Sequence, residues 1–149
     1  MTEALSYFTM AWFDPGLLAL TALGTLAGIY IGAIPGLSVT MAVSILVSFT
    51  FGWDVNQALA LIVGIYIGGV YGGSRSAILL NIPGAPSSVA TAFDGYPLAK
   101  MGEAGRAIGL STVMSVIGGL VGVLVLASAA PIIGDLALKF APRDYFLIA

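Results

Sequence analysis

The chain has 149 residues, of which 59% are hydrophobic and only 8% are charged. Soluble domains carry roughly 25% charged residues, so this composition predicts an integral membrane protein. A net charge of −2 offers no basic surface for nucleic acid, and the sequence has neither His nor Cys to form a metal site, a thiolate or a Ser/His pair, so we expect no enzyme, no cofactor and no metal site.

The few charged residues divide the chain into apolar stretches, each the length of one or two membrane crossings of about 20 residues. We therefore expect an all-α protein, a polytopic transmembrane helix bundle with interrupted helices or a re-entrant hairpin, in a single transmembrane domain over residues 1–149. The predicted spans are residues 16–34, 37–52 and 55–73, a broken or re-entrant segment at 77–93, and a last span at 107–134. Asp54, just before the third span, is the expected N-cap of its helix.

Glycine recurs at every fourth residue in two of these spans, which allows a neighbouring helix to approach closely in lipid. The stripes are Gly24, Gly28 and Gly32 in the first span and Gly64, Gly68 and Gly72 in the third. The segment 28–32 also reads Gly-Ile-Tyr-Ile-Gly, as does 64–68, an offset of 36 residues (64 − 28). Chance similarity and a true internal repeat both remain open, and a true repeat would place Tyr71–Ser74 as a helix end related to Pro35–Ser38.

Two interruptions of the helical pattern are the candidate solute site. Irregular backbone is tolerated within a membrane only where protein buries it or where it lines a wet cavity. Because Pro suits the first helical position, a new helix is expected to begin at Pro86, and its free N–H groups would suit a carboxylate. The alternative is that these residues only kink a packed helix. The predicted substrate-binding residues are Pro35, Gly36, Leu37 and Ser38 in the first interruption, and Asn81, Pro83, Gly84, Ala85, Pro86, Ser87 and Ser88 in the second.

Arg75 lies within apolar sequence, where an unpaired guanidinium costs several kcal/mol. One interpretation is that it reaches lipid headgroups at the membrane interface, and the other is that it attracts an anionic solute or holds an interruption in place. Further along, residues 94–106 are expected to form a polar surface loop with a turn at Asp94–Gly95. The apolar end at 145–149 is interpreted as the first turns of another span, so the chain is expected to be the N-terminal part of a larger transporter.

Three segments resemble the large membrane subunit, of the TctA type, of the tripartite tricarboxylate transporter family. They are Gly32–Ser38, which reads GAIPGLS, then Tyr66–Gly84, which reads YIGGVYGGSRSAILLNIPG, and Thr91–Ala99, which reads TAFDGYPLA. The resemblance covers nearly the whole chain and the first third of a full family member. It implies a multi-pass protein of the bacterial inner membrane that carries carboxylates by secondary transport.

The same resemblance implies a small membrane subunit and a periplasmic solute-binding protein as partners. We therefore expect uptake of organic di- or tricarboxylates, coupled by symport to H⁺ or Na⁺, with solute contacts at residues 35–38 and 81–88. Two alternatives remain: a structural membrane subunit that packs through its glycine stripes without transporting, and a channel, for which the sequence lacks a continuous polar stripe.

Overall fold

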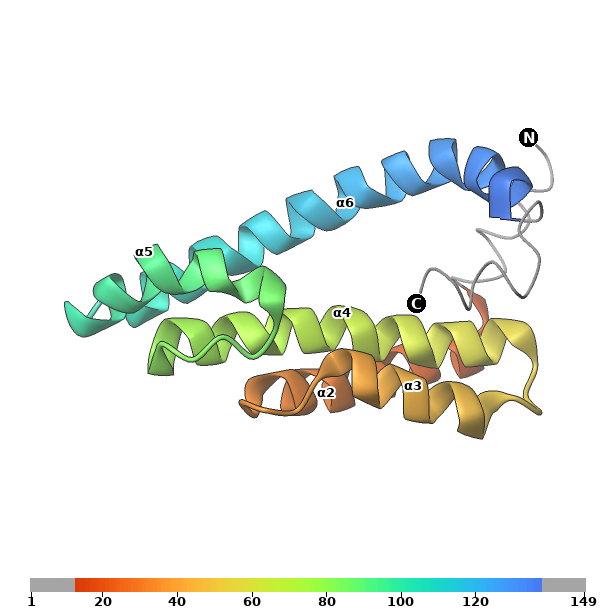
Figure 1. Ribbon diagram of the computed structural model, residues 1–149, viewed down its shortest axis with the longest axis horizontal. Helices are drawn as coiled ribbons and strands as arrows, with labels where there is room; N and C mark the ends of the chain where they lie inside the picture. The colour runs from red at the N-terminus through yellow and green to blue at the C-terminus, as the bar shows by residue number, and fades with distance from the viewer. Residues whose placement is uncertain (1–12, 138–149) are drawn as a thin grey trace. The chain divides into compact units, whose positions relative to one another are not determined.

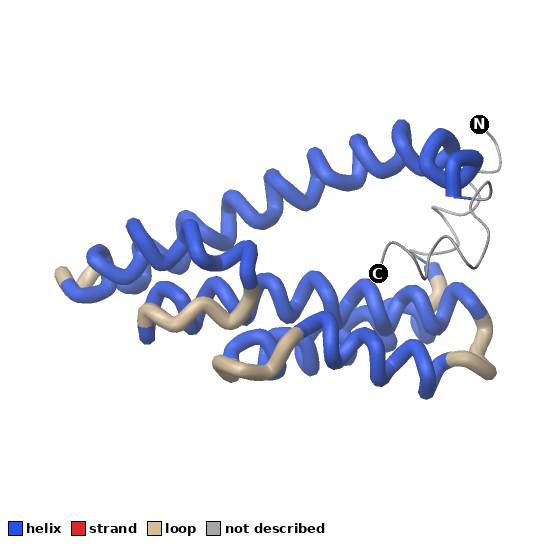
Figure 2. The backbone as a smooth tube through the Cα atoms, viewed as in Figure 1, coloured by secondary structure: helices blue, strands red, loops and turns tan. Residues whose placement is uncertain are grey.

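The computed structural model describes residues 13–137, and all regular secondary structure in this range is helical (Figures 1 and 2). The long helices α2, α4 and α6 are each apolar and long enough to cross a membrane, and α3 is apolar but shorter. The elements are α2 Pro15–Ala33, α3 Val39–Thr50, α4 Val55–Leu80, the short 3₁₀ helix η1 Pro86–Ser88, α5 Val89–Lys100 and α6 Ala104–Ala137. The predicted all-α membrane fold is confirmed.

The chain divides into two compact units, residues 1–111 and 112–149. The described part of the second unit is the continuation of α6 to Ala137. All other described helices, and the first two turns of α6, belong to the first unit, which contains both interruptions of the helical pattern.

An aspartate caps the N-terminus of α2, and another caps that of α4. An Asp14 carboxylate oxygen accepts hydrogen bonds from the N–H groups of Gly16 and Leu17, at 2.7 and 3.3 Å. Asp54, as predicted, accepts one from the N–H of Asn56 at 2.9 Å. Each carboxylate satisfies amides that have no partner within the helix and complements the positive end of the helix dipole.

Helices α2 and α4 run parallel and pack through their glycine stripes, so the predicted close approach of a neighbouring helix is confirmed for both (Figure 1). A Cβ added to any of the six glycines would lie within 3.0 Å of a carbonyl oxygen on the other helix. Gly24 contacts Leu61 O and Gly64 contacts Thr21 O, and the same exchange recurs at Gly28 with Gly68 and at Gly32 with Gly72. The two backbones are therefore in direct contact over three helical turns.

In this packing, residues whose numbers differ by 40 lie side by side, as Gly24 and Gly64 do (64 − 24). The repeated sequence has an offset of 36, which differs from this register by one helical turn. The expected relation between two helix ends is wrong, because Tyr71–Ser74 lies inside α4 and only Pro35–Ser38 follows a helix end. The predicted end of the third span at residue 73 is wrong for the same reason. Glycines that resemble a helix terminus serve here for close packing, since Gly72 contacts Ile29 O of α2.

Two further boundaries differ from the predictions. The segment 77–93 divides into the end of α4, a loop at 81–85, η1 and the start of α5. The expected surface loop at 94–106 is wrong up to Lys100, because α5 continues through it. Gly95 is buried against Ile78 of α4, so it serves for close contact, and the turn comes later, around Gly102 with φ +84°.

Candidate functional site

The first interruption is a tight turn that its own sequence specifies. The N–H of Leu37 donates to the carbonyl of Ile34 at 3.2 Å, which closes a four-residue turn around Pro35 and Gly36. Pro35 has a fixed φ that suits the second position, and Gly36 supplies φ +95° at the third, the pattern of a type II turn. The chain reverses here, and α3 runs back from its N-cap, Ser38 (Figure 2).

The second interruption begins where α4 ends on a left-handed residue. Asn81 has φ 58°, and its N–H donates to Ala77 O at 3.1 Å. The chain then folds back along α4, so that the N–H of Gly84 donates to Gly73 O at 3.4 Å. Gly84 also contacts Gly32 O at the end of α2. The second interruption therefore lies beside the end of α2, where the first interruption begins.

A new helix then begins at Pro86, as predicted. Ala85 is the N-cap of η1, Pro86 is its first residue, and α5 continues from Val89. Pro suits this position because its fixed φ is helical and its missing N–H would have had no acceptor within the helix.

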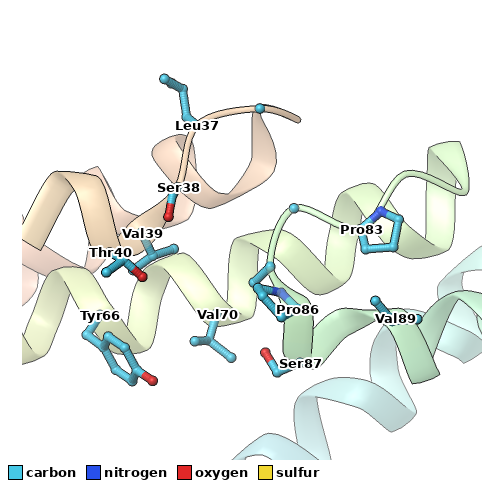
Figure 3. Close-up of a pocket in the computed structure, with 13 residues that line it drawn as sticks. Leu37, Ser38, Val39, Thr40, Tyr66, Val70, Pro83, Pro86, Ser87 and Val89 are labelled. Atoms are coloured by element: carbon cyan, nitrogen blue, oxygen red, sulfur yellow. The ribbon is translucent and has the colours of Figure 1, made fainter. Parts of the chain in front are cut away.

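The two interruptions border one cavity of about 770 Å³ in the first unit (Figure 3). Figure 3 shows Ser38 and Thr40 on one side, Pro86 and Ser87 on the other, and Val70 of α4 between them. The lining residues are Gly36, Leu37, Ser38, Val39, Thr40, Tyr66, Val70, Pro83, Gly84, Ala85, Pro86, Ser87 and Val89.

The cavity is lined by hydroxyl groups, backbone and apolar side chains, and none of its described lining residues is charged. The hydroxyls belong to Ser38, Thr40, Tyr66 and Ser87. The first hydrogen bond of α3 runs from Ala42 N–H to Ser38 O, so the N–H groups of residues 39–41 have no acceptor within the helix. The Ser38 side chain does not cap them.

Eight of the eleven predicted substrate-binding residues line this cavity, and three do not. Pro35 lies exposed in its turn, Asn81 is exposed at the end of α4, and Ser88 is buried with only 2% of its surface accessible. Five further lining residues are not among the predicted ones: Val39, Thr40, Tyr66, Val70 and Val89. Thr40 did carry a signal, since it places a hydroxyl two residues beyond the first interruption, whereas Tyr66 and the three valines carried none.

Arg75 does not line the cavity. Its guanidinium lies 3.7 Å from the centre of the Tyr71 ring, and its Nη1 donates to Ile108 O at 3.2 Å. Beside it, the Ser111 hydroxyl lies 3.5 Å from that of Ser74. These contacts join α4 to the first turns of α6, so Arg75 makes a structural contact close to the second interruption.

The sequence of the chain matches a family of transporter proteins. Residues 18–149 match the Tripartite tricarboxylate transporter TctA family. A protein of Agrobacterium vitis named "Uncharacterized 52.8 kDa protein in TAR-I ttuC' 3'region" is 42% identical over 125 residues, which are 84% of this chain and 25% of that protein. The chain therefore spans about a quarter of the length of this relative. No solved structure matches.

Proposed function

Because the chain belongs to the tripartite tricarboxylate transporter TctA family, we propose that it forms part of the membrane component of a carrier for organic carboxylates. The cavity between the two interruptions would be part of its solute site. One observation carries this proposal: two interruptions far apart in the sequence meet at a single cavity lined by hydroxyls and backbone.

The start of α3 has the chemistry to hold a carboxylate. The N–H groups of residues 39–41 have no acceptor within the helix and carry the partial positive charge of a helix N-terminus. The hydroxyls of Ser38 and Thr40 can donate to the same anion, and Ser87 can donate from the opposite wall. Valine and proline side chains would contact the carbon skeleton of the solute.

The uncharged lining also supports coupling to a cation. A carboxylate in a membrane cavity without a positive side chain is costly unless hydrogen bonds or a counterion offset its charge. A proton or Na⁺ that enters with the solute would lower this cost, so we propose symport with H⁺ or Na⁺. The family name describes a tripartite transporter, which supports two further components. We propose that these are a small membrane subunit and a periplasmic solute-binding protein. We also propose that this chain lies in the bacterial inner membrane.

Substitution of the cavity hydroxyls in the full-length transporter tests the proposal. Ser38→Ala and Ser87→Ala should each raise the half-saturating carboxylate concentration about tenfold, because each removes a hydrogen bond to a charged group. Ser48→Ala is the matched control, since Ser48 lies exposed on α3 outside the cavity. Uptake by purified transporter in liposomes with an imposed ion gradient measures the effect. If both variants match the control, the site assignment fails.

The alternative of a purely structural subunit finds less support. The glycine stripes of α2 and α4 pack against each other, so they are occupied within the chain. A carboxylate that raises the unfolding temperature of the complete transporter would favour the carrier, and no shift at saturating concentrations would favour the structural subunit.

A further inference from the structure

Helix α4 carries two neighbouring pairs of glycines near the cavity, and each pair contributes to two different contacts. Gly68 and Gly72 contact the backbone of α2, at Thr25 O and Ile29 O. The pairs are Gly68 with Gly69 and Gly72 with Gly73. Gly69 lies against the first residue of α3, and Gly73 lies against the second interruption. Each pair therefore places one glycine against α2 and one against an interruption, although Gly69 also contacts Gly32 of α2 through its backbone.

Gly69 provides the space for the first residue of α3. A Cβ added to Gly69 would lie 2.5 Å from Cγ2 and 2.9 Å from Cγ1 of Val39. Val39 is only 6% exposed, and it lines the cavity next to Ser38. The α3 wall of the cavity therefore rests on Gly69 through one side chain.

Gly73, one turn further along α4, provides the same space for the second interruption. An added Cβ there would lie 2.9 Å from the backbone nitrogen of Ala85 and 3.2 Å from its Cβ. Ala85 is 8% exposed and lines the cavity next to Pro86. The closest contact of this wall with Gly73 is made by the backbone of Ala85. A change of the Ala85 side chain therefore cannot remove it.

We propose that Gly69 and Gly73 are positioning residues that set the spacing between the two walls of the cavity. Each glycine admits one wall to direct contact with α4, and the two contacts stand one helical turn apart. A methyl group at either position would force its wall outward by roughly 1 Å, the difference between the overlap and an ordinary van der Waals contact. The effect on solute binding rests on the proposed function, whereas the effect on wall spacing does not.

The test uses full-length transporter without other cysteines, with spin labels at Ile45→Cys on α3 and Phe93→Cys on α5. Both positions are exposed and lie outside the cavity. Gly69→Ala should lengthen the mean distance between the labels and raise the half-saturating carboxylate concentration roughly tenfold, because a site tolerates displacements of only about 0.5 Å. Adding Val39→Ala removes both Cγ atoms, which are the closest to the new methyl group, and leaves only Val39 Cβ at 3.2 Å, so most of the original distance should be restored.

Gly73→Ala is the matched control for this rescue. It should also lengthen the distance, but neither Val39→Ala nor Ala85→Gly should restore it, because the overlap is with the backbone of Ala85. An unchanged label distance in Gly69→Ala, or an equal rescue of both glycine variants by Val39→Ala, would overturn the inference.

Two further results separate the positioning role from the proposed solute site and from a failure to fold. If the distance changes and is rescued while the half-saturating concentration stays constant, the positioning role stands and the proposed solute site fails. If Gly69→Ala does not fold, Val39→Ala alone should bring α3 closer to α4 and shorten the label distance. No shortening in that variant would contradict the proposal.

Discussion

The two interruptions meet at the same cavity, yet they are held by different kinds of interaction. The first is a turn whose hydrogen bond joins Leu37 to Ile34, with Pro35 and Gly36 in positions that they favour in any protein. A Cβ added to Gly36 would meet no atom within 4 Å. The turn is therefore encoded locally and depends little on its surroundings.

The second interruption depends on distant residues. Gly84 donates to Gly73 O and contacts both Gly32 O and the Ser76 hydroxyl, so three separate parts of the chain meet at one residue. If α2 and α4 were not in contact, the segment that contains Gly84 would not be held beside both helices. The turn of the first interruption is therefore specified by its own residues and the second interruption by packing, so substitutions within the two should have very different effects.

The largest effect is expected from Gly84→Ala. The added Cβ would lie 2.8 Å from Gly73 Cα and 3.0 Å from Ser76 Oγ, besides its overlap with Gly32 O. Because most of these neighbours are backbone, the segment must move, and we expect a loss of about 3 kcal/mol of stability together with loss of uptake. Thermal unfolding of the full-length transporter measures the first effect. Gly52→Ala, which meets no atom within 4 Å, is the control, and equal melting temperatures of the two variants would contradict the packing argument.

A smaller effect is expected from Arg75→Ala, which tests how the chain beyond the second interruption is anchored. The change removes the stacking on Tyr71 and the hydrogen bond to Ile108 O, and we expect about 2 kcal/mol of destabilisation. The half-saturating carboxylate concentration should stay unchanged, because Arg75 lies outside the cavity lining. A raised half-saturating concentration with an unchanged melting temperature would instead indicate that Arg75 attracts the anionic solute.

Gly36→Ala probes the locally encoded turn and should cost only about 1 kcal/mol, because φ +95° strains an alanine while no neighbour is displaced. The measurement is again thermal unfolding, alongside Gly84→Ala. If Gly36→Ala is the more damaging of the two, the first interruption depends on contacts beyond its own turn, and the distinction between the two interruptions fails.

The features that could be predicted from the sequence are those that single residues encode. Pro35, Gly36 and Pro86 mark the turn and the new helix start because their backbone preferences hold in any surroundings. The capping role of Asp54 and the close packing of glycine stripes follow from equally local patterns. All of these agree with the structure.

The rest depends on which helix faces meet. Gly72 and Gly73 resemble a helix end in sequence, and only the presence of α2 and Ala85 beside them shows that they serve for close contact. Gly95 follows an aspartate and therefore resembles a turn residue in sequence, although it packs against Ile78 of α4. Tyr66 and Val70 could not be assigned to the cavity, because nothing in the sequence shows that the start of α3 packs beside them on α4.

The smallest effect is expected from Asn81→Gly, at the start of the second interruption. Asn81 has φ 58°, a conformation that glycine adopts without strain, so the free energy of unfolding should change by less than about 1 kcal/mol. Its side chain is exposed and does not line the cavity, so the half-saturating carboxylate concentration should stay constant. Asn81→Ala is the paired variant and should be less stable than Asn81→Gly, because only alanine is strained at this φ. If both variants instead weaken carboxylate uptake to the same extent, the amide itself contacts the solute, and the second wall of the site extends to the end of α4.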